Sequence, residues 1–358
     1  MPREADLFDA ARTMPSPERV AYLDRECAGD PALRARVEAL LLGDHEAGSF
    51  LDSPLATLAT GAPFEETAGL RIGRYKLLEK IGEGGCGVVW MAEQSEPVRR
   101  RVALKVIKLG MDTREVIARF EAERQALALM DHPNIARVLD GGATDTGRPF
   151  FVMELVRGLP ITRYCDEAKL TPTQRLELFI TVCSAVQHAH QKGVIHRDLK
   201  PSNILATVND GVATPKVIDF GIAKATQGPL TDKTLFTAFQ QFIGTPAYMS
   251  PEQTDLSSVD IDTRADIYSL GVLLYELLTG APPFDPKTLL AGGVDEIRRI
   301  IRQVEPARPS TRVATLAVPE RTTLSRQRSL AAHELSVALR GDLDWIVMRC
   351  LEKDRARR

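Results

Sequence analysis

The sequence has few cysteines, no apolar leader and no long hydrophobic run, and each absence excludes a class of protein. Its five cysteines are widely spaced and form no CxxC pair, which excludes a disulfide framework or a zinc finger as the basis of the fold. The first residues, MPREADLFDA, carry charges where a secretory leader has an apolar core. No run reaches the roughly 18 apolar residues of a membrane span. We therefore expect a cytoplasmic protein with no membrane segment within these residues.

An excess of charge of either sign is also missing. The chain has 46 basic and 48 acidic residues and a net charge of −2, so no nucleic-acid partner is expected. Hydrophobic residues make up 44% and charged residues 26% of the 358 residues. This composition is ordinary for a globular protein with two or three compact units.

Residues 1–45 predict a small helical module, and residues 46–73 predict a linker. Within the module, Ser16 and Asp30 each directly precede a proline, which is typical of a helix N-cap followed by proline at the first helical position. The linker is rich in Gly, Pro, Ser and Thr. Two roles stay open for the module: a docking or regulatory domain, or a helical cap on the rest of the chain.

The rest of the chain falls into two parts joined by a short connection at 154–158. Residues 74–153 show the alternation and glycine turns of strands. Residues 159–358 contain long segments with helical periodicity, such as Pro172–Lys192 and Ala265–Thr279. This pattern predicts an α+β fold with a strand-rich lobe, a helical lobe and a cleft between them.

A glycine-rich turn between two predicted strands contains Gly82, Gly84 and Gly87. Glycines at this spacing let backbone amides approach phosphate oxygens, although a plain hairpin turn explains the pattern as well. A dinucleotide fold is disfavoured because the segment after the turn, VVWMAEQ, continues as a strand rather than a helix. Lys105, in the next apolar strand, is either a solvated edge residue or a ligand for the same phosphates.

The strongest signal is the sequence HRDLKPSN at 196–203, followed by Asp219 in a DFG triplet. Phosphoryl transfer requires a group that receives the proton of the attacking hydroxyl, cations that neutralise the phosphates, and ligands for those cations. Asp198 supplies the first, and Lys200 adds a positive charge. Asn203 and Asp219 supply the hard oxygen ligands that suit Mg2+.

Together these motifs resemble those of eukaryotic-like bacterial serine/threonine protein kinases, and the resemblance covers residues 74–358. It implies the bilobal protein-kinase fold and ATP-dependent transfer of the γ-phosphate to serine or threonine hydroxyls of protein substrates, with ATP and Mg2+ as cofactors. It assigns catalytic roles to Asp198, Lys200, Lys105 and the lysine's helix partner Glu123, and metal binding to Asn203 and Asp219. It assigns nucleotide contacts to Ile81, Gly82, Gly84, Gly87, Val89, Ala103, Lys105, Met153, Glu154, Val156 and Leu205.

The resemblance also implies regulation through an activation segment between Asp219 and Glu252. Phosphorylation is expected at one or more of Thr231, Thr234 and Thr237, by self-association for trans-autophosphorylation, unless these are ordinary loop residues. Arg197 would pair with the resulting phosphate. Further structural roles fall to Thr245 beside the catalytic loop, to a Glu252–Arg358 pair, to Asp266 as holder of the catalytic-loop backbone, and to a spine of His196, Phe220, Leu127 and Val138.

Four features depart from the family pattern. Cys86 occupies the tip of the glycine loop, and Ser250 stands where many relatives have alanine. Ser202 replaces a glutamate of several arginine-directed kinases, which removes support for a basic substrate preference. The chain stops at Arg358, where the resemblance leads us to expect at least one more helix and therefore a fragment or truncated product.

Two other functions compete with an active protein kinase. A pseudokinase scaffold would bind ATP without transferring phosphate, but every residue needed for the chemistry is present. A small-molecule kinase of related fold, such as an antibiotic phosphotransferase, is disfavoured by the segment GTPAYMSPE at 244–252. In the resembling family that segment is a platform for a peptide substrate.

Overall fold

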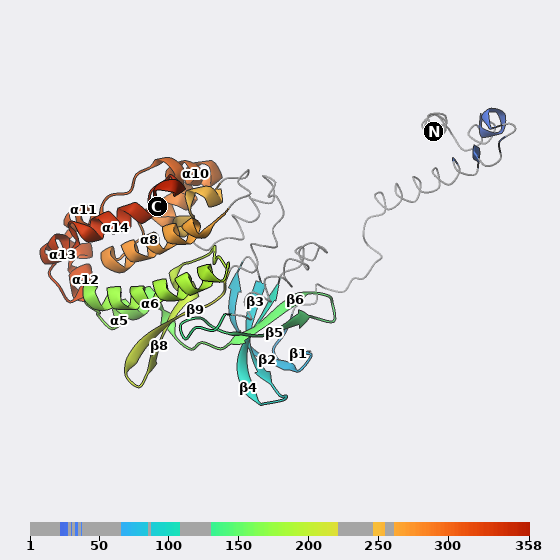
Figure 1. Cartoon of the computed structure of the whole chain (residues 1–358), viewed down its shortest axis with the longest axis horizontal. Helices are drawn as coiled ribbons and strands as arrows, with labels where there is room; N and C mark the ends of the chain where they lie inside the picture. The colour runs from blue at the N-terminus through green and yellow to red at the C-terminus, as the bar shows by residue number, and fades with distance from the viewer. Residues whose placement is uncertain are drawn as a thin grey trace. The chain divides into compact units, whose positions relative to one another are not determined.

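A computed structural model of the chain describes residues 22–27, 30, 33–34, 37, 66–84, 87–107, 130–220, 246–254 and 261–358. The chain divides into two compact units, 1–66 and 67–358 (Figure 1). The first strand of the second unit begins at Arg71, shortly before the expected start of the strand-rich part. The predicted boundaries of module, linker and lobes stay predictions.

The described part of the first unit is helical. Residues 22–26 form a helix, and a small apolar cluster consists of Leu23, Cys27, Leu33 and Val37. Asp30 Oδ1 accepts a hydrogen bond from the backbone N–H of Leu33 at 2.9 Å, which is the contact expected of an N-cap residue. The second predicted cap, Ser16, lies outside the described residues.

In the second unit, six strands form one antiparallel sheet in the order β1-β2-β3-β4-β6-β5. Strand β4 is buried on both faces, because Val102, Leu104 and Val106 enter one apolar cluster while Ala103 and Ile107 enter another. The strands are Arg71–Ile72 (β1), Tyr75–Gly84 (β2), Gly87–Gln94 (β3), Arg100–Ile107 (β4), Val138–Ala143 (β5) and Pro149–Glu154 (β6).

A second sheet of three strands interrupts the part of the chain that was expected to be helical. It consists of Leu159–Pro160 (β7), Ile204–Asn209 (β8) and Val212–Val217 (β9). The hairpin between β8 and β9 turns at Asp210 and Gly211, whose φ angles of 52° and 79° suit a tight two-residue turn. Strand β9 also pairs with the segment before β5, through a parallel bridge between Ile135 and Val217.

Two long helices form the centre of the helical part. Helix α6 (Pro172–Gln191) begins with a capping box between Thr171 and Gln174. Helix α8 (Thr263–Thr279) begins at the capping residue Asp262 and ends at Gly280, whose left-handed φ of 85° suits glycine. The other helices and short 3-10 turns within the described ranges are Ile161–Glu167 (α5), Pro201–Asn203 (η1), Pro246–Tyr248 (η2), Pro251–Thr254 (η3), Pro286–Ala291 (α9), Gly293–Gln303 (α10), Pro309–Ala314 (α11), Val318–Arg328 (α12), Ala332–Leu339 (α13), Asp342–Cys350 (α14) and Arg355–Arg357 (η4).

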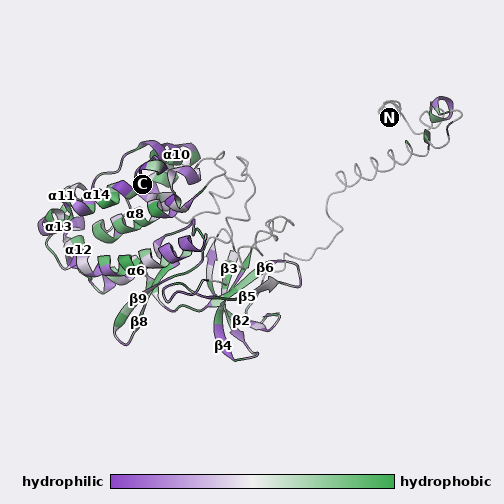
Figure 2. Ribbon diagram, viewed as in Figure 1, coloured by the Kyte–Doolittle hydropathy of each residue, from purple (hydrophilic) through white to green (hydrophobic). Residues whose placement is uncertain are grey.

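Helix α8 is largely buried within this core. Thirteen of its residues are buried, and α6 and α14 pack against it (Figure 1). Hydrophobic residues run along almost its whole length, as Figure 2 shows. Gly271 is required where α14 crosses it, because a Cβ there would lie 2.5 Å from Cys350 Cβ. Within the described ranges, no helix combines the length and apolarity needed to cross a bilayer.

Candidate active site

The three glycines of the turn between β2 and β3 have different physical explanations. Among the described residues, a Cβ added to Gly84 would meet nothing within 4 Å, and one added to Gly82 would meet only Val89 at 3.7 Å. A Cβ on Gly87 would lie 2.2 Å from the carbonyl oxygen of Val106, so Gly87 is required by the close approach of β3 to β4. The part of the protein that the structure describes therefore leaves space at Gly82 and Gly84, as a ligand-binding loop requires.

Lys105 connects the strand-rich part to the segment that follows β9. Its side chain is on the β4 face that carries Ala103 and Ile107, and the residue is only 8% exposed. Lys105 Nζ forms an ion pair with Asp219 Oδ1. Asp219 has a left-handed backbone, with φ of 61°, which is unusual for a residue with a side chain. The predicted partner Glu123 lies outside the described residues.

The catalytic-loop residues converge on Asp198. Lys200 Nζ contacts Asp198 Oδ2 at 2.8 Å. Asn203 Nδ2 donates to the backbone carbonyl of Asp198 at 2.8 Å and to its Oδ2 at 3.2 Å. Asn203 Oδ1 accepts only a long hydrogen bond, 3.5 Å, from Ser202 Oγ among the described contacts. The amide oxygen thus retains capacity to bind a cation.

Asp266 holds the backbone just before Asp198. It is fully buried, and its two oxygens accept hydrogen bonds from the N–H groups of His196 and Arg197, both at 2.8 Å. His190 Nε2 lies 2.8 Å from the same carboxylate. Arg197 has a φ of 63°, and a left-handed residue with a side chain costs about 1–2 kcal/mol. The buried carboxylate offsets that cost by satisfying the two N–H groups.

The apolar residues of the predicted spine are close to this loop. The rings of His196 and Phe220 are 4.6 Å apart, and His196 Nε2 is 3.1 Å from the carbonyl oxygen of Ile218. Val138 packs against the apolar core cluster that contains Phe220. The fourth predicted member, Leu127, lies outside the described residues.

Residues expected around the adenine lie on neighbouring strands. Val89 pairs with Lys105, and Ala103 pairs with Met153. Ala103 and Met153 are buried, whereas Leu205 and Val156 are partly exposed. Ile81, which is also assigned to the nucleotide, is 47% exposed.

A contact that holds the connection between the two parts was not predicted from the sequence. Glu154 Oε1 forms an ion pair with Lys216 Nζ of β9, and its Oε2 is 3.4 Å from the N–H of Arg137. The N–H of Glu154 donates to the carbonyl of Arg137 at 2.9 Å. The alternation of side chains along β9 predicts which face of the strand carries Lys216. It does not predict that Lys216 lies opposite Glu154, 62 positions away.

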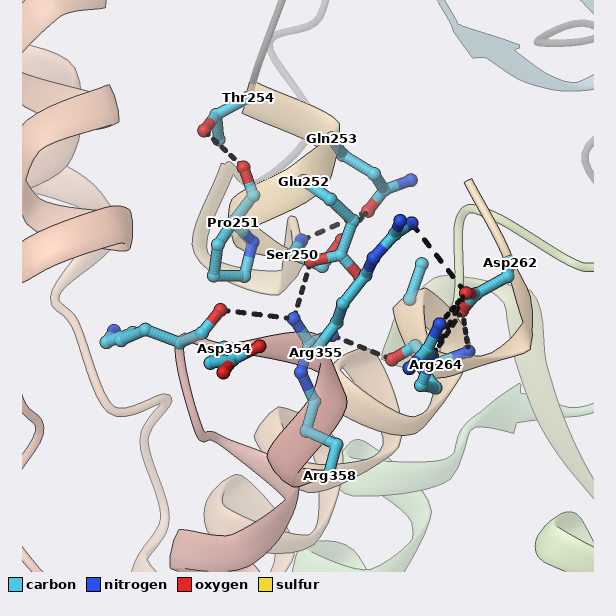
Figure 3. Close-up of polar contacts among 12 residues, drawn as sticks. Ser250, Pro251, Glu252, Gln253, Thr254, Asp262, Arg264, Asp354, Arg355 and Arg358 are labelled. Carbon is cyan, nitrogen blue, oxygen red and sulfur yellow. Dashed lines mark hydrogen bonds and ion pairs between the residues drawn. The ribbon is translucent and has the colours of Figure 1, made fainter. Parts of the chain in front are cut away.

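The pair between Glu252 and Arg358 is buried and doubly hydrogen-bonded. Arg358 Nη1 and Nη2 donate to the two Glu252 oxygens at 2.7 and 2.5 Å, and the arginine side chain is 0% exposed. Figure 3 shows this arginine beside the turn η3, with Arg264 and Asp262 on the neighbouring segment. The pair fixes η3 to the C-terminal helices.

Several predicted positions lie outside the described residues: Thr231, Thr234, Thr237, Thr245 and Cys86. Across the part of the chain that the structure describes, no group of three or more His, Cys, Asp or Glu side chains could hold a metal ion. A kinase-type magnesium site does not need one, because one carboxylate, one amide oxygen and the phosphates of the nucleotide complete it. Asp219 and Asn203 fit that donor set.

Comparison with known proteins places these residues in a family. The protein kinase domain model matches residues 75–358. Serine/threonine-protein kinase Pkn1 of Myxococcus xanthus is 36% identical over 247 residues, which cover 68% of this chain and 34% of that protein. Serine/threonine-protein kinase PknB of Mycobacterium leprae is 37% identical over 251 residues, which cover 68% of this chain and 38% of that protein. The chain thus spans about a third to two fifths of the length of these relatives.

Solved structures show the same fold. A mutant of the Mycobacterium tuberculosis PknI kinase domain superposes with a TM-score of 0.55 at 23% identity, over 82% of this chain and 93% of that one. The domain without the mutation gives a TM-score of 0.51 at 24% identity, over 77% and 98%. The predicted α+β bilobal fold and the predicted resemblance to bacterial serine/threonine protein kinases are confirmed. The chain belongs to the protein kinase family.

Proposed function

We propose that this chain is an ATP-dependent serine/threonine protein kinase that transfers the γ-phosphate of ATP to hydroxyl groups of protein substrates. The observation that carries the proposal is a set of two linked clusters. Lys105 pairs with Asp219, and Asp198 contacts Lys200 and Asn203. A 2.9 Å hydrogen bond from the N–H of Ile218 to the carbonyl of Asn203 joins the two segments. The names of the bacterial relatives support serine and threonine as acceptors.

Each residue has a distinct role in this proposal. Asp198 receives the proton of the attacking hydroxyl, and Asn203 orients Asp198 through the hydrogen bonds from its Nδ2. Lys105 and Lys200 place positive charge beside the phosphates. Mg2+ bound by Asp219 and Asn203 would neutralise charge on the phosphate oxygens. The open space at Gly82 and Gly84 admits the phosphates beneath the glycine turn.

Adenine recognition is assigned to the connection after β6. The backbone of Glu154 and Val156 would bind the edge of the base, between Val89, Ala103 and Leu205. Met153 closes the pocket at the back, where it is buried beside Ala103. The exposed Ile81 would become covered by the nucleotide, which accounts for an apolar side chain at that position.

Activation by phosphorylation of Thr231, Thr234 or Thr237 in trans is part of the proposal. Arg197, beside the catalytic base, provides the cation that such a phosphate would bind. Phosphopeptide mapping of active protein should find at least one of these threonines modified. Active protein in which all three remain unmodified would disprove this part alone.

The test is transfer of labelled phosphate from ATP and Mg2+ to myelin basic protein and to the chain itself, with Asp198→Asn as the control. Label that requires Asp198 supports the kinase. Nucleotide binding without transfer would instead indicate a pseudokinase scaffold, and transfer only to small molecules would indicate a metabolite kinase.

A further inference from the structure

Gln253, on the turn η3, contacts both the segment before it and the catalytic loop. Its Oε1 accepts hydrogen bonds from the N–H of Ser250 at 3.0 Å and from Ser250 Oγ at 3.2 Å. Its Nε2 donates to the carbonyl oxygen of Arg197 at 2.7 Å. A backbone N–H can only donate and a carbonyl can only accept, so the orientation of the amide is fixed by chemistry. Figure 3 shows the contacts between Gln253 and Ser250.

This arrangement gives a physical reason for the serine at position 250, where many kinases have alanine. The residue is fully buried, and a buried hydroxyl needs a hydrogen-bond partner. Gln253 supplies that partner, so the two residues belong together. Glu252, between them, is held by the buried side chain of Arg358. The turn that carries Gln253 is therefore fixed to the C-terminal helices.

Arg197, at the other end of the contact, is the strained residue that precedes the catalytic base. Its N–H donates to Asp266 at 2.8 Å, and its carbonyl accepts from Gln253 at 2.7 Å. Both backbone polar groups of this left-handed residue are thus bound, one from each side. The carbonyl belongs to the peptide plane that Arg197 shares with Asp198. Holding it fixes the direction in which the chain enters Asp198.

We propose that Gln253 is a positioning residue, which holds Asp198 in its reactive orientation through the Arg197 carbonyl and thereby couples the substrate-binding segment to the catalytic base. The inference rests on the proposed role of Asp198 and goes beyond it. Because an error of about 1 Å in the placement of a reacting group can cost a hundredfold in rate, loss of this contact should lower kcat rather than weaken binding of ATP or substrate.

The experiment measures kcat and KM for protein phosphorylation by the full chain with three variants. Gln253→Met keeps the length of the side chain but removes both contacts, and we expect kcat to fall about tenfold or more with both KM values unchanged. Ser250→Ala leaves the Arg197 contact intact and should lose at most about twofold in kcat. Gln191→Met, at the exposed end of α6, is the matched control and should behave as wild type.

A fourth variant, Gln253→Glu, separates positioning from general loss of structure. A carboxylate still accepts from Ser250 but cannot donate to the Arg197 carbonyl, whereas a protonated carboxyl can. The kcat of Gln253→Glu at pH 8, where an unperturbed glutamate is ionised, should therefore fall at least as far as that of Gln253→Met, again with both KM values unchanged. Its near-identical shape keeps the test valid if Gln253→Met unfolds.

The outcomes separate this inference from the proposed function. A wild-type chain that transfers no phosphate would overturn both. An active wild type with an unchanged Gln253→Met variant would overturn the positioning role alone. So would a variant that raises KM for the protein substrate at unchanged kcat, because Gln253 would then hold the substrate segment and not the base.

Discussion

Replacing Glu276 with glutamine should change how the stability of this protein depends on pH. Glu276 is near the end of α8, and its Oε2 is buried without a hydrogen-bond partner among the described residues. Burial, reinforced by the charge of Asp166, raises its pKa to about 7. Arg328 opposes the shift, but its Nη1 binds Asp166 at 2.6 Å and its Nη2 donates to the backbone carbonyl of Glu276 at 3.3 Å.

The magnitude follows from the two pKa values. In the unfolded chain this carboxyl titrates near 4.5, and a shift to about 7 corresponds to about 3 kcal/mol of unfolding free energy. The folded state binds the proton more tightly, so the contribution of Glu276 to stability is present below pH 4.5. It is lost as the pH rises from 4.5 to 7. Glutamine has no proton to lose, and the variant should therefore be about 1–3 kcal/mol more stable than wild type at pH 8.

Urea unfolding at pH 5 and pH 8 measures this difference. Glu177→Gln, on the exposed side of α6, is the control, because an exposed carboxyl should show the same small effect at both values. Other titrating groups affect wild type and variant alike and cancel in the difference. A Glu276→Gln difference that is equal at the two pH values would refute the reasoning, since the carboxyl would then not titrate between them.

Three further variants test the proposed site and its supports. Lys105→Met should lower phosphate transfer about a hundredfold or more at an unchanged thermal midpoint, measured with labelled ATP, because the lysine faces the phosphates; unchanged transfer would rule out that role. Glu252→Gln should lower the free energy of unfolding, measured in urea, by about 3–5 kcal/mol, because it leaves a buried arginine without its charge partner. The control Glu296→Gln breaks an exposed arginine pair and should lower that free energy by under about 1 kcal/mol. Lys216→Met should raise KM for ATP about fivefold with kcat unchanged, because it frees Glu154 and the proposed adenine-binding backbone; a fall in kcat alone would contradict it.

The two long helices could be predicted from the sequence because the signals at their ends are local. The capping box from Thr171 to Gln174 spans four residues, and the end of α8 depends on a single glycine at 280. Both helices were predicted to within two residues at each end. The β8–β9 hairpin, two six-residue strands between the two long helices, was missed although its Asp210-Gly211 turn is typical of a hairpin. A short apolar run does not distinguish a strand from a helix by periodicity.

The polar contacts of the candidate site were harder to predict, because each joins residues that are far apart in sequence. Gln253 and Arg197 are 56 positions apart, and Glu154 and Lys216 are 62 apart. A hydrogen bond requires its two atoms within about 3.2 Å, whereas a pattern of strands and helices places residues only on faces and edges. Such contacts become predictable only when a known family supplies the tertiary arrangement, as it did for Asp266.

Gln253 shows why family resemblance also has a limit. The resemblance covers the residues that relatives share, and it gave Ser250 only as a departure from an alanine. The structure shows that the hydroxyl and the glutamine three positions later satisfy each other and reach the strained backbone before Asp198. The serine at position 250 is unexplained when it is considered alone. It is explained by its pairing with Gln253, because a buried polar group is retained only together with its partner. Departures from a family motif are therefore where the partners of the reactive residues should be sought.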